Sequence, residues 1–538
     1  MPSFISKLSR GVRRRFEHSI NNWRIKRINK EVQNHEPPPV KRPVVIFNAS
    51  TRIQGLSLNA AYSLLSGWSL RLVGTPVVYF GCNSGMSQCV LGTNRENLRA
   101  SPPCRKCVGQ SKNLYSKESV SWFSYVKDDD LESMIRELKL DDLIAFEYQG
   151  IPLGELIIPS MRWVLRRHHL LDDEDSRSLF RQYILSAWNV ARNFVVLIEV
   201  IDPLAVVVFN GMFFPEAVVR HLCMENGIRV ITHEVGMMPC TGYFTTGQAT
   251  AYPIDIPSSF TLNTKQNHKL DEYLGQRFHG NFSMAGIQFW PEMRGLDEGL
   301  TCKIATFPQM VSVFTNVVFD TSQGHANRIF PHMFSWLDLV LQVIKANKET
   351  LFVIRAHPDE YRSGKESRES VADWIKQNGV DHLPNVLFVN SSEYISSYEL
   401  IQRSKFVMVY NSTIGLEATL MNSAVLCGGK ARYTQLPTVF IPGSPEEYLL
   451  MAEEFLATSR IEIPNDFLRN ARRFLYYQIF RTSLPFYDFI REEKSWLGYV
   501  SMKPFSWKEL LPKNSQTLSV VVDGVVKNQP FLLSEEEE

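Results

Sequence analysis

Apolar residues gather in short runs that alternate with longer stretches of helical spacing. The run 43–48 precedes a helical pattern at 58–70, and a second apolar run follows at 76–80. Continuous apolar runs of this length are typical of strands buried on both faces of a parallel sheet. The alternation returns later and predicts strands at 204–209, 229–232, 311–319, 350–354, 386–389, 406–410 and 424–427, with helices at 176–199, 215–226, 333–347, 370–378, 397–402, 416–421, 445–459 and 466–477.

Strands that alternate with helices in this way predict an α/β fold with two Rossmann-like, doubly wound domains. The chain of 538 residues is long enough for both. The predicted units are residues 1–40 (basic helix and Pro-rich linker), 41–305 (first Rossmann-like domain), 306–470 (second Rossmann-like domain) and 471–538 (helical segment ending in the acidic tail Glu535–Glu538).

The first 30 residues form a basic segment, with nine Lys or Arg against one acid, Glu17. Apolar residues recur there every three or four positions, which predicts an amphipathic helix. Such a helix can lie in an anionic membrane surface with its apolar face down, or pack on the body of the protein, and the sequence leaves both open. The apolar positions are Phe4, Leu8, Val12, Phe16, Ile20 and Trp23.

Composition narrows the class of protein. A net charge of +2 provides no global basic field for nucleic acid. No apolar run approaches the roughly 20 residues of a membrane-spanning helix, and no signal-peptide core begins the chain. We therefore expect a cytoplasmic protein, attached at most to the inner face of the plasma membrane.

Polar turns follow three strands of the second predicted domain. They are 355–360, 411–418 and 428–430, and two of them contain glycine. Because the carboxyl ends of parallel strands meet at one edge of a sheet, where ligands bind, we expect these turns to form one site.

The turn 411–417 has the features of a phosphate site at a helix N-terminus. Ser412 and Thr413 add hydroxyl donors, Gly415 permits close approach, and Glu417 can accept from a ribose hydroxyl. The alternative is a capped helix without ligand, in which Thr413 is the N-cap. His357 and Gly428-Gly429, at the same predicted sheet edge, favour the ligand. The side chain of Arg355 or of His357 could neutralise a phosphate.

These motifs together resemble the bacterial glycosyltransferases of capsule and surface-polysaccharide biosynthesis. That family is similar to the Kdo transferases and, more distantly, to bacterial sialyltransferases. The resemblance covers about residues 200–435 and rests on Asn210-Gly211, Glu234-Val235-Gly236, Thr315-Asn316-Val317, Phe319-Asp320, Arg355-Ala356-His357-Pro358, 395–400, 410–418, Gly428-Gly429-Lys430 and Tyr433.

The resemblance implies a GT-B fold, in which two Rossmann-like domains face each other across a cleft. The first domain would bind the acceptor and the second the nucleotide-sugar, without a catalytic metal. His357 would assist departure of the nucleotide. The implied donor and phosphate residues are Arg355, Pro358, Asn411, Ser412, Thr413, Gly415, Glu417, Gly428, Gly429 and Lys430.

The general base is less clearly indicated. The sialyltransferase-like groups have an acidic pair before a glycine, whereas this chain has the single acid Glu234 two positions before Gly236. We expect Glu234 to be the base, with Asp320 and His233 as rivals; a salt-bridged loop carboxylate is the alternative for Glu234. The expected acceptor side consists of Asn210, Gly211, His233 and Asp320.

Four of the eight cysteines cluster at Cys82, Cys89, Cys104 and Cys107. Four thiolates usually select zinc or an iron–sulfur cluster. Structural zinc is the first expectation, free thiols in a substrate loop the alternative, and an iron–sulfur cluster the third.

The sequence thus predicts transfer of a sugar from a nucleotide-activated donor to a surface or capsular polysaccharide or a glycolipid. Two other interpretations stay open because a fold does not fix a function. One is a polyol-phosphate transferase or sugar-nucleotide epimerase on the same fold. The other is a non-catalytic scaffold of a polysaccharide assembly complex.

Overall fold

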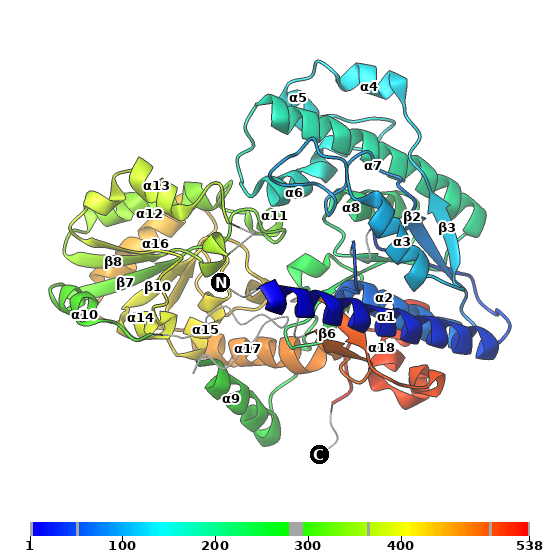
Figure 1. Cartoon of the computed structure of the whole chain (residues 1–538). Helices are drawn as coiled ribbons and strands as arrows, with labels where there is room; N and C mark the ends of the chain where they lie inside the picture. Colours follow the sequence, from blue (N-terminus) through cyan, green and yellow to red (C-terminus); the bar gives the residue numbers. More distant parts are fainter. Residues whose placement is uncertain (1–3, 50–52, 279–293, 363–365, 494–497, 536–538) are drawn as a thin grey trace.

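The chain folds into two α/β domains that lie beside each other (Figure 1). The computed structural model describes residues 4–49, 53–278, 294–362, 366–493 and 498–535. Each domain is built on its own sheet, one of seven strands and one of five. The predicted α/β fold with two Rossmann-like domains is confirmed.

The first sheet has the strand order β12-β6-β5-β4-β1-β2-β3. The five neighbouring strands β5-β4-β1-β2-β3 are parallel, and their order, 3-2-1-4-5, is that of the first five strands of a Rossmann fold. The antiparallel β6 and β12 extend one edge. The strands are β1 (Val44–Phe47), β2 (Val77–Cys82), β3 (Ser119–Phe123), β4 (Ala205–Phe209), β5 (Val230–Val235), β6 (Thr241–Thr245) and β12 (Leu484–Pro485).

Helices cover both faces of this sheet because its residues alternate between two cores. Val44, Ile46 and Tyr79 pack with α1, α2 and α18, whereas Val45 and Phe47 pack with α6, α7 and α8. The helices of this domain are α1 (Phe4–His35), α2 (Leu58–Leu72), α3 (Cys104–Leu114), α4 (Asp129–Ile135), α5 (Leu140–Ile144), α6 (Leu153–Leu165), α7 (Glu174–Ile201), α8 (Phe214–Glu225) and α18 (Gln516–Lys527).

The second sheet is wholly parallel and has the order β11-β10-β7-β8-β9, the same 3-2-1-4-5 arrangement. The helices α12, α13 and α16 cover one face, and α14, α15 and α17 the other. The elements are β7 (Gln309–Phe314), β8 (Thr350–Arg355), β9 (Val386–Val389), β10 (Phe406–Val409), β11 (Val425–Cys427), α9 (Thr264–Phe278), α10 (Glu298–Ala305), α11 (Gln323–Ala326), α12 (Met333–Ala346), α13 (Val371–Gln377), α14 (Ser397–Arg403), α15 (Ile414–Leu420), α16 (Pro445–Ala457) and α17 (Asn465–Tyr476).

The C-terminal part of the chain returns to the first domain. β12 pairs with β6, α18 packs on α2, and a small hairpin of β13 (Ile490–Glu492) and β14 (Val500–Met502) contacts α1. The expected C-terminal segment 471–538 therefore contributes to the first sheet and its core. Of the predicted acidic tail, Glu535 accepts a hydrogen bond from Arg481, and Glu536–Glu538 lie outside the described residues.

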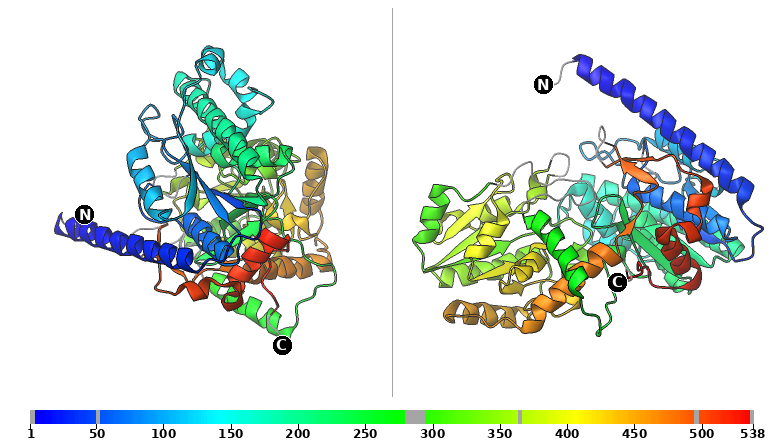
Figure 2. Two further views of the ribbon diagram at one scale, coloured as in Figure 1. Left: turned by 90° about the vertical axis from the view of Figure 1, so that its right-hand side faces the viewer. Right: turned by 90° about the horizontal axis from the view of Figure 1, so that it is seen from below.

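The second half of the N-terminal helix α1 binds to the body of the protein. Asn21, Ile25, Ile28 and Val32 are buried against the first domain. The other end of the helix extends away from the rest of the chain (Figure 2). The side chains of Phe4, Leu8 and Val12 lie outside the described residues.

One helix corrects an expectation about apolar runs. α7 contains an 18-residue window with a mean hydropathy of 1.5 and is long enough to cross a membrane. Its apolar face packs on the first sheet and on α6 and α8, so the structure uses it as a core helix. The sequence did not indicate a helix of this length and hydropathy, because polar residues of α7 interrupt the apolar run.

Candidate functional site

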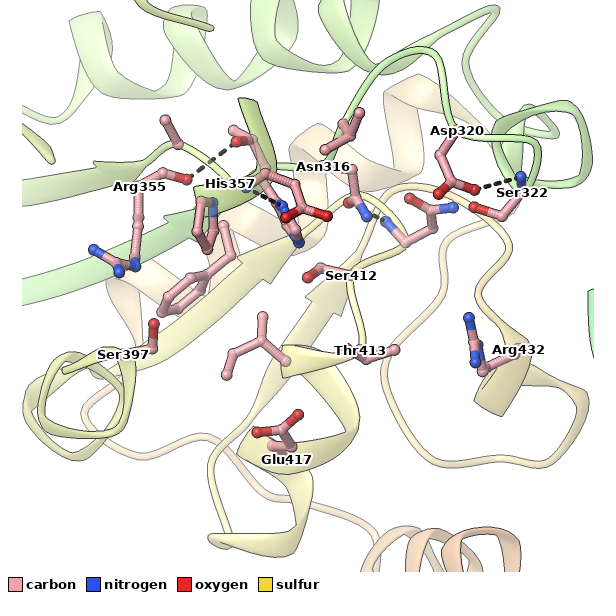
Figure 3. A pocket seen from close by; sticks show the side chains of 18 of the residues that line it. Asn316, Asp320, Ser322, Arg355, His357, Ser397, Ser412, Thr413, Glu417 and Arg432 are labelled. Atoms are coloured by element: carbon pink, nitrogen blue, oxygen red, sulfur yellow. Dashed lines mark hydrogen bonds between the residues drawn. The ribbon is translucent and has the colours of Figure 1, made fainter. Parts of the chain in front are cut away.

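A pocket of about 240 Å³ opens at the carboxyl edge of the second sheet (Figure 3). It lies where the chain order reverses, between the neighbouring strands β7 and β10. Ligands bind at this position in open parallel sheets because adjacent loops diverge there and leave a crevice. Eight of the predicted site residues line it: Asp320, Arg355, His357, Pro358, Asn411, Ser412, Thr413 and Glu417.

The loops after β7 and β10 are joined across the crevice. The backbone N–H of Asn411 donates to Oδ1 of Asn316 at 3.3 Å. Thr315 donates through its hydroxyl to the carbonyl of Arg355 at 3.1 Å. These bonds connect three neighbouring strand ends and hold the floor of the pocket (Figure 3).

His357 is held in one tautomer. The backbone N–H of Asp359 donates to Nδ1 of His357 at 3.2 Å, so the proton of the neutral ring lies on Nε2. Burial lowers the pKa of His357, against the opposing effect of the carboxylates of Asp359 and Asp320. The ring is therefore a neutral Nε2–H donor in the pocket wall, and a bound anion would raise its pKa.

Arg355 supplies positive charge at the end of β8. Its side chain is buried, and burial lowers its pKa to about 10, which still leaves the guanidinium charged at neutral pH. A buried cation beside a pocket interacts strongly with an anionic ligand because little water screens it.

The 412–413 turn presents hydroxyl groups to the same pocket. Thr413 precedes α15, but its side chain makes no capping hydrogen bond, unlike the capped-helix alternative. The carbonyl of Ser412 accepts from the hydroxyl of Tyr433 at 2.8 Å. Gly415 serves this packing, because a Cβ there would lie 2.2 Å from the Tyr433 oxygen.

Glu417 forms a buried ion pair in the pocket wall. Its carboxylate accepts from Arg277 at 2.7 Å and from the hydroxyl of Tyr398 at 2.6 Å. Both partners also line the pocket. Glu417 thus fixes α15 to α9 and α14.

The turn Gly428–Lys430 lies behind the pocket and does not line it. A Cβ at Gly428 would lie 2.5 Å from the ring of Trp336, and one at Gly429 would lie 3.1 Å from the carbonyl of Ala326. The backbone N–H of Lys430 donates to that carbonyl, and its side chain is exposed. The two glycines allow close packing of backbone against α12 and α11.

Glu234 lies at the end of β5 and faces the second domain. Its carboxylate accepts a hydrogen bond from Nδ2 of Asn210 at 2.8 Å. The backbone of Asn210 and of Gly211 is in the left-handed conformation. Burial and repulsion from Asp320 raise the pKa of Glu234, while Arg432 acts in the opposite direction. Glu234, Asp320 and Arg432 therefore share one electrostatic environment between the domains.

His233 points the other way, into the core of the first domain. It is fully buried beside Tyr62 and Phe244, with Nε2 3.5 Å from the hydroxyl of Ser63. Successive residues of a strand face opposite sides, so Glu234 and His233 cannot both face the second domain. The structure separates the predicted base Glu234 from the predicted acceptor-side residue His233.

A larger pocket of about 920 Å³ lies at the carboxyl edge of the first sheet, between β1 and β4. Residues of both domains line it, including Trp163, Arg166, Glu216 and Glu366. Glu216 accepts from the backbone N–H of Ala49 at 2.8 Å, and burial raises its pKa to about 7. Both sheets thus carry a pocket at the point where strand order reverses.

Three site residues were absent from the sequence prediction: Arg277, Arg432 and Glu216. Arg432 lines the pocket of the second sheet with its guanidinium 4.2 Å from the ring centre of Tyr252, across the domain boundary. Arg277 comes from α9, which does not directly follow a strand. Glu216 could have been found, since it lies in the first turn of the helix after β4.

Two groups of side chains have the chemistry of metal ligands. Cys82, Cys89, Cys104 and Cys107 line one small pocket of the first domain. His168, His169 and His332 bring their nitrogens within 4.8 Å of one another at the domain boundary. The second group is already hydrogen-bonded, because His169 contacts both Glu369 and His332, and Nδ1 of His332 accepts from the N–H of Ser335.

Comparison with known proteins confirms the resemblance for the second domain. Residues 268–436 match the sequence profile of the family described as capsule polysaccharide biosynthesis protein. Protein FixF of Sinorhizobium fredii is 29% identical over 232 residues, 43% of this chain and 50% of FixF. The match thus spans half the length of that relative.

Solved structures give more distant likenesses. The β-Kdo 2,4-transferase of Thermosulfurimonas dismutans KpsC is 10% identical, with a TM-score of 0.35 over 52% of this chain and 80% of that chain. Its β-Kdo 2,7-transferase is 12% identical, with a TM-score of 0.32 over 59% and 86%. A UDP-GlcNAc 2-epimerase of Neisseria meningitidis is 11% identical, with a TM-score of 0.23 over 81% and 99%.

Proposed function

We propose that the protein is a glycosyltransferase that moves a sugar from a nucleotide donor to a surface or capsular glycan or a glycolipid. One observation carries the proposal. Arg355, His357, Ser412 and Thr413 line a single pocket where strand order reverses, within the segment that matches capsule polysaccharide biosynthesis proteins.

The phosphate of the nucleotide-sugar fits the charge and the hydrogen-bond donors of this pocket. Arg355 supplies charge, Ser412 and Thr413 supply hydroxyl groups, and Nε2–H of His357 donates to a phosphate oxygen. As the bond between the anomeric carbon and the phosphate oxygen breaks, negative charge grows on the nucleotide. These donors stabilise that charge in a site with little water.

Glu234 is proposed as the general base. An acceptor hydroxyl attacks the anomeric carbon, the new carbon–oxygen bond forms as the nucleotide leaves, and the hydroxyl proton passes to Glu234. The raised pKa of Glu234 brings the carboxylate closer to the pKa that suits a base at neutral pH. Asn210 keeps the carboxylate turned toward the second domain.

The test is a transfer assay with Glu234→Gln. We expect kcat to fall roughly 10²–10⁴-fold, the usual contribution of a general base, while nucleotide affinity stays unchanged. The control is Glu447→Gln, which removes an exposed helix-cap carboxylate and should leave kcat unchanged. Wild-type kcat in Glu234→Gln would refute this base, and nucleotide release without any acceptor would favour an epimerase or hydrolase.

We also propose that α1 attaches the protein to an anionic membrane surface on the cytoplasmic side. Phe16 is 67% exposed and Trp23 60% exposed, seven positions apart and so on one helical face. Arg15 and Lys26 are exposed beside them. Apolar side chains with flanking cations suit the headgroup region of anionic lipids.

A further inference from the structure

The four clustered cysteines come from three separate segments and meet at one pocket. Cys82 ends β2, Cys89 lies in the loop after it, and Cys104 and Cys107 form the first turn of α3. None of the four is in a disulfide. The remaining wall is mainly apolar and includes Ala49, Ile53, Met86, Leu91, Pro102, Pro103 and Val108.

The loop around the cysteines is shaped to enclose them. The backbone N–H of Gly85 donates to Sγ of Cys82 at 3.2 Å, a contact that stabilises thiolate ligands. A Cβ at Gly92 would lie 2.8 Å from Sγ of Cys89 and 2.8 Å from Pro102. Glycine at position 92 thus lets the segment before α3 close over the sulfur of Cys89.

No three of the four sulfurs lie as close together as a single zinc ion would hold them. A tetrahedral zinc ion with bonds of about 2.3 Å holds its four thiolates about 3.8 Å apart. Among the described residues, the histidine trio alone brings three ligand atoms within 4.8 Å of one another, so no three of these sulfurs do. A cluster of several irons holds its thiolates farther apart than one ion does, since each iron takes its own ligands.

We propose that Cys82, Cys89, Cys104 and Cys107 bind an iron–sulfur cluster in the first domain. This reverses the order expected from the sequence, where zinc came first. Each thiol loses its proton to solvent as its sulfur bonds to iron.

The position of the cluster gives it a structural role beside the large pocket of the first sheet. Ala49, Met86, Cys89 and Leu91 line both the cysteine pocket and the large pocket of the first sheet. A cluster bound to Cys89 fixes this shared wall. The loop 83–103 joins β2 to α3 and contains no helix or strand. A cluster that links the two ends of this loop therefore restricts its conformations.

The test is the iron and acid-labile sulfide content of the full chain, purified without oxygen or reconstituted with ferrous iron and sulfide. We expect about two or four irons per chain, an equal amount of sulfide, and a visible charge-transfer absorption. Cys104→Ser/Cys107→Ser should lose all three. Cys302→Ser, which changes an exposed cysteine of α10, should keep them.

Three results would overturn the proposal: stoichiometric zinc that iron does not displace, no metal after reconstitution, or full iron content in the double variant. If the double variant fails to fold, as judged by circular dichroism, Cys107→Ser alone is used and should lower the iron content at least twofold. The readout is metal content, so its outcome is independent of the glycosyltransferase proposal.

Discussion

His357 and His233 place the same side chain in opposite settings. Both follow or belong to a strand, and burial lowers the pKa of both. His357 has its Nδ1 bound to a backbone N–H and directs Nε2 into a pocket, so its burial serves a ligand. His233 is enclosed by aromatic rings, and its Nδ1 has no hydrogen-bond partner among the described residues.

This contrast predicts how stability depends on pH. The pKa of His233 falls from 6.5 to about 3 in the folded chain, so below pH 6.5 the unfolded chain binds a proton that the folded chain does not. The contribution of His233 to the free energy of unfolding is therefore complete above pH 6.5 and is lost as the pH falls. At pH 5 the loss is about 2 kcal/mol.

The measurement is the free energy of unfolding of the wild type and His233→Phe at pH 8 and pH 5. Phenylalanine suits the ring stack with Phe244 and cannot be protonated. The wild type should lose about 2 kcal/mol more than the variant between the two pH values. Equal losses would show that His233 does not titrate on unfolding.

The sequence predicted the site residues that directly follow strands. It missed site residues that come from other parts of the chain. His357 and Ser412 were found because parallel strands end at one edge. Arg277 and Glu417 are 140 positions apart, and nothing in either segment indicates that they pair. Gly428 and Gly429 were read as ligand-binding, although their absent side chains make room for Trp336 and backbone.

Among the elements, those with a continuous apolar pattern were predicted within a few residues of their observed bounds. This includes β1, β4, β8, β10 and α12. β3 was missed because it is an edge strand with only Phe123 fully buried, so its residues lack an apolar run. β6 was missed because Thr241 and Gly242 break its apolar pattern, and β12 because it has only two residues.

The helix α1 has both buried and exposed positions. Asn21, Ile25, Ile28 and Val32 are buried on the first domain, whereas Phe16 and Trp23 are exposed, and the N-terminal end extends outward. Deleting residues 1–30 would remove Ile25 and Ile28 from the core. A loss of membrane binding could then not be separated from a loss of stability. Substitution of the exposed side chains is therefore the sharper experiment.

We expect Phe16→Ser/Trp23→Ser to bind vesicles containing phosphatidylserine less tightly than the wild type, by roughly tenfold per side chain. Leu450→Ser, which changes a 66% exposed leucine of α16, is the control and should bind like the wild type. Vesicle flotation gives the bound fraction. Equal binding by all three proteins would exclude α1 as the membrane contact.

The whole molecule joins two sheets of the same strand order, each with a pocket where that order reverses. The C-terminal part crosses back and adds β12 to the first sheet, so the two domains are linked twice. Tyr252 and Arg432 meet between them, near Glu234 and Asp320. A donor on the second domain and an acceptor on the first would meet at this contact.

The double link could not be predicted from the sequence. It depends on short strands and on pairing between residues more than 240 positions apart, as in Leu484 with Gly242. The division into two Rossmann-like domains could be predicted, because each domain repeats the local alternation of strand and helix. Long-range pairing decides where the end of the chain lies, and no local pattern encodes it.

The most direct test of the account is thermal unfolding with CMP-, UDP-, GDP- and CDP-linked ligands. A nucleotide that binds the native pocket stabilises it by about 2.7 kcal/mol at a concentration one hundred times its Kd. We predict that at least one ligand raises the Tm of the wild type and of His382→Ala, whose histidine is exposed. His357→Ala and Ser412→Ala should weaken the binding at least tenfold. If no nucleotide raises the Tm, or if His357→Ala responds like the wild type, the pocket is not a nucleotide site.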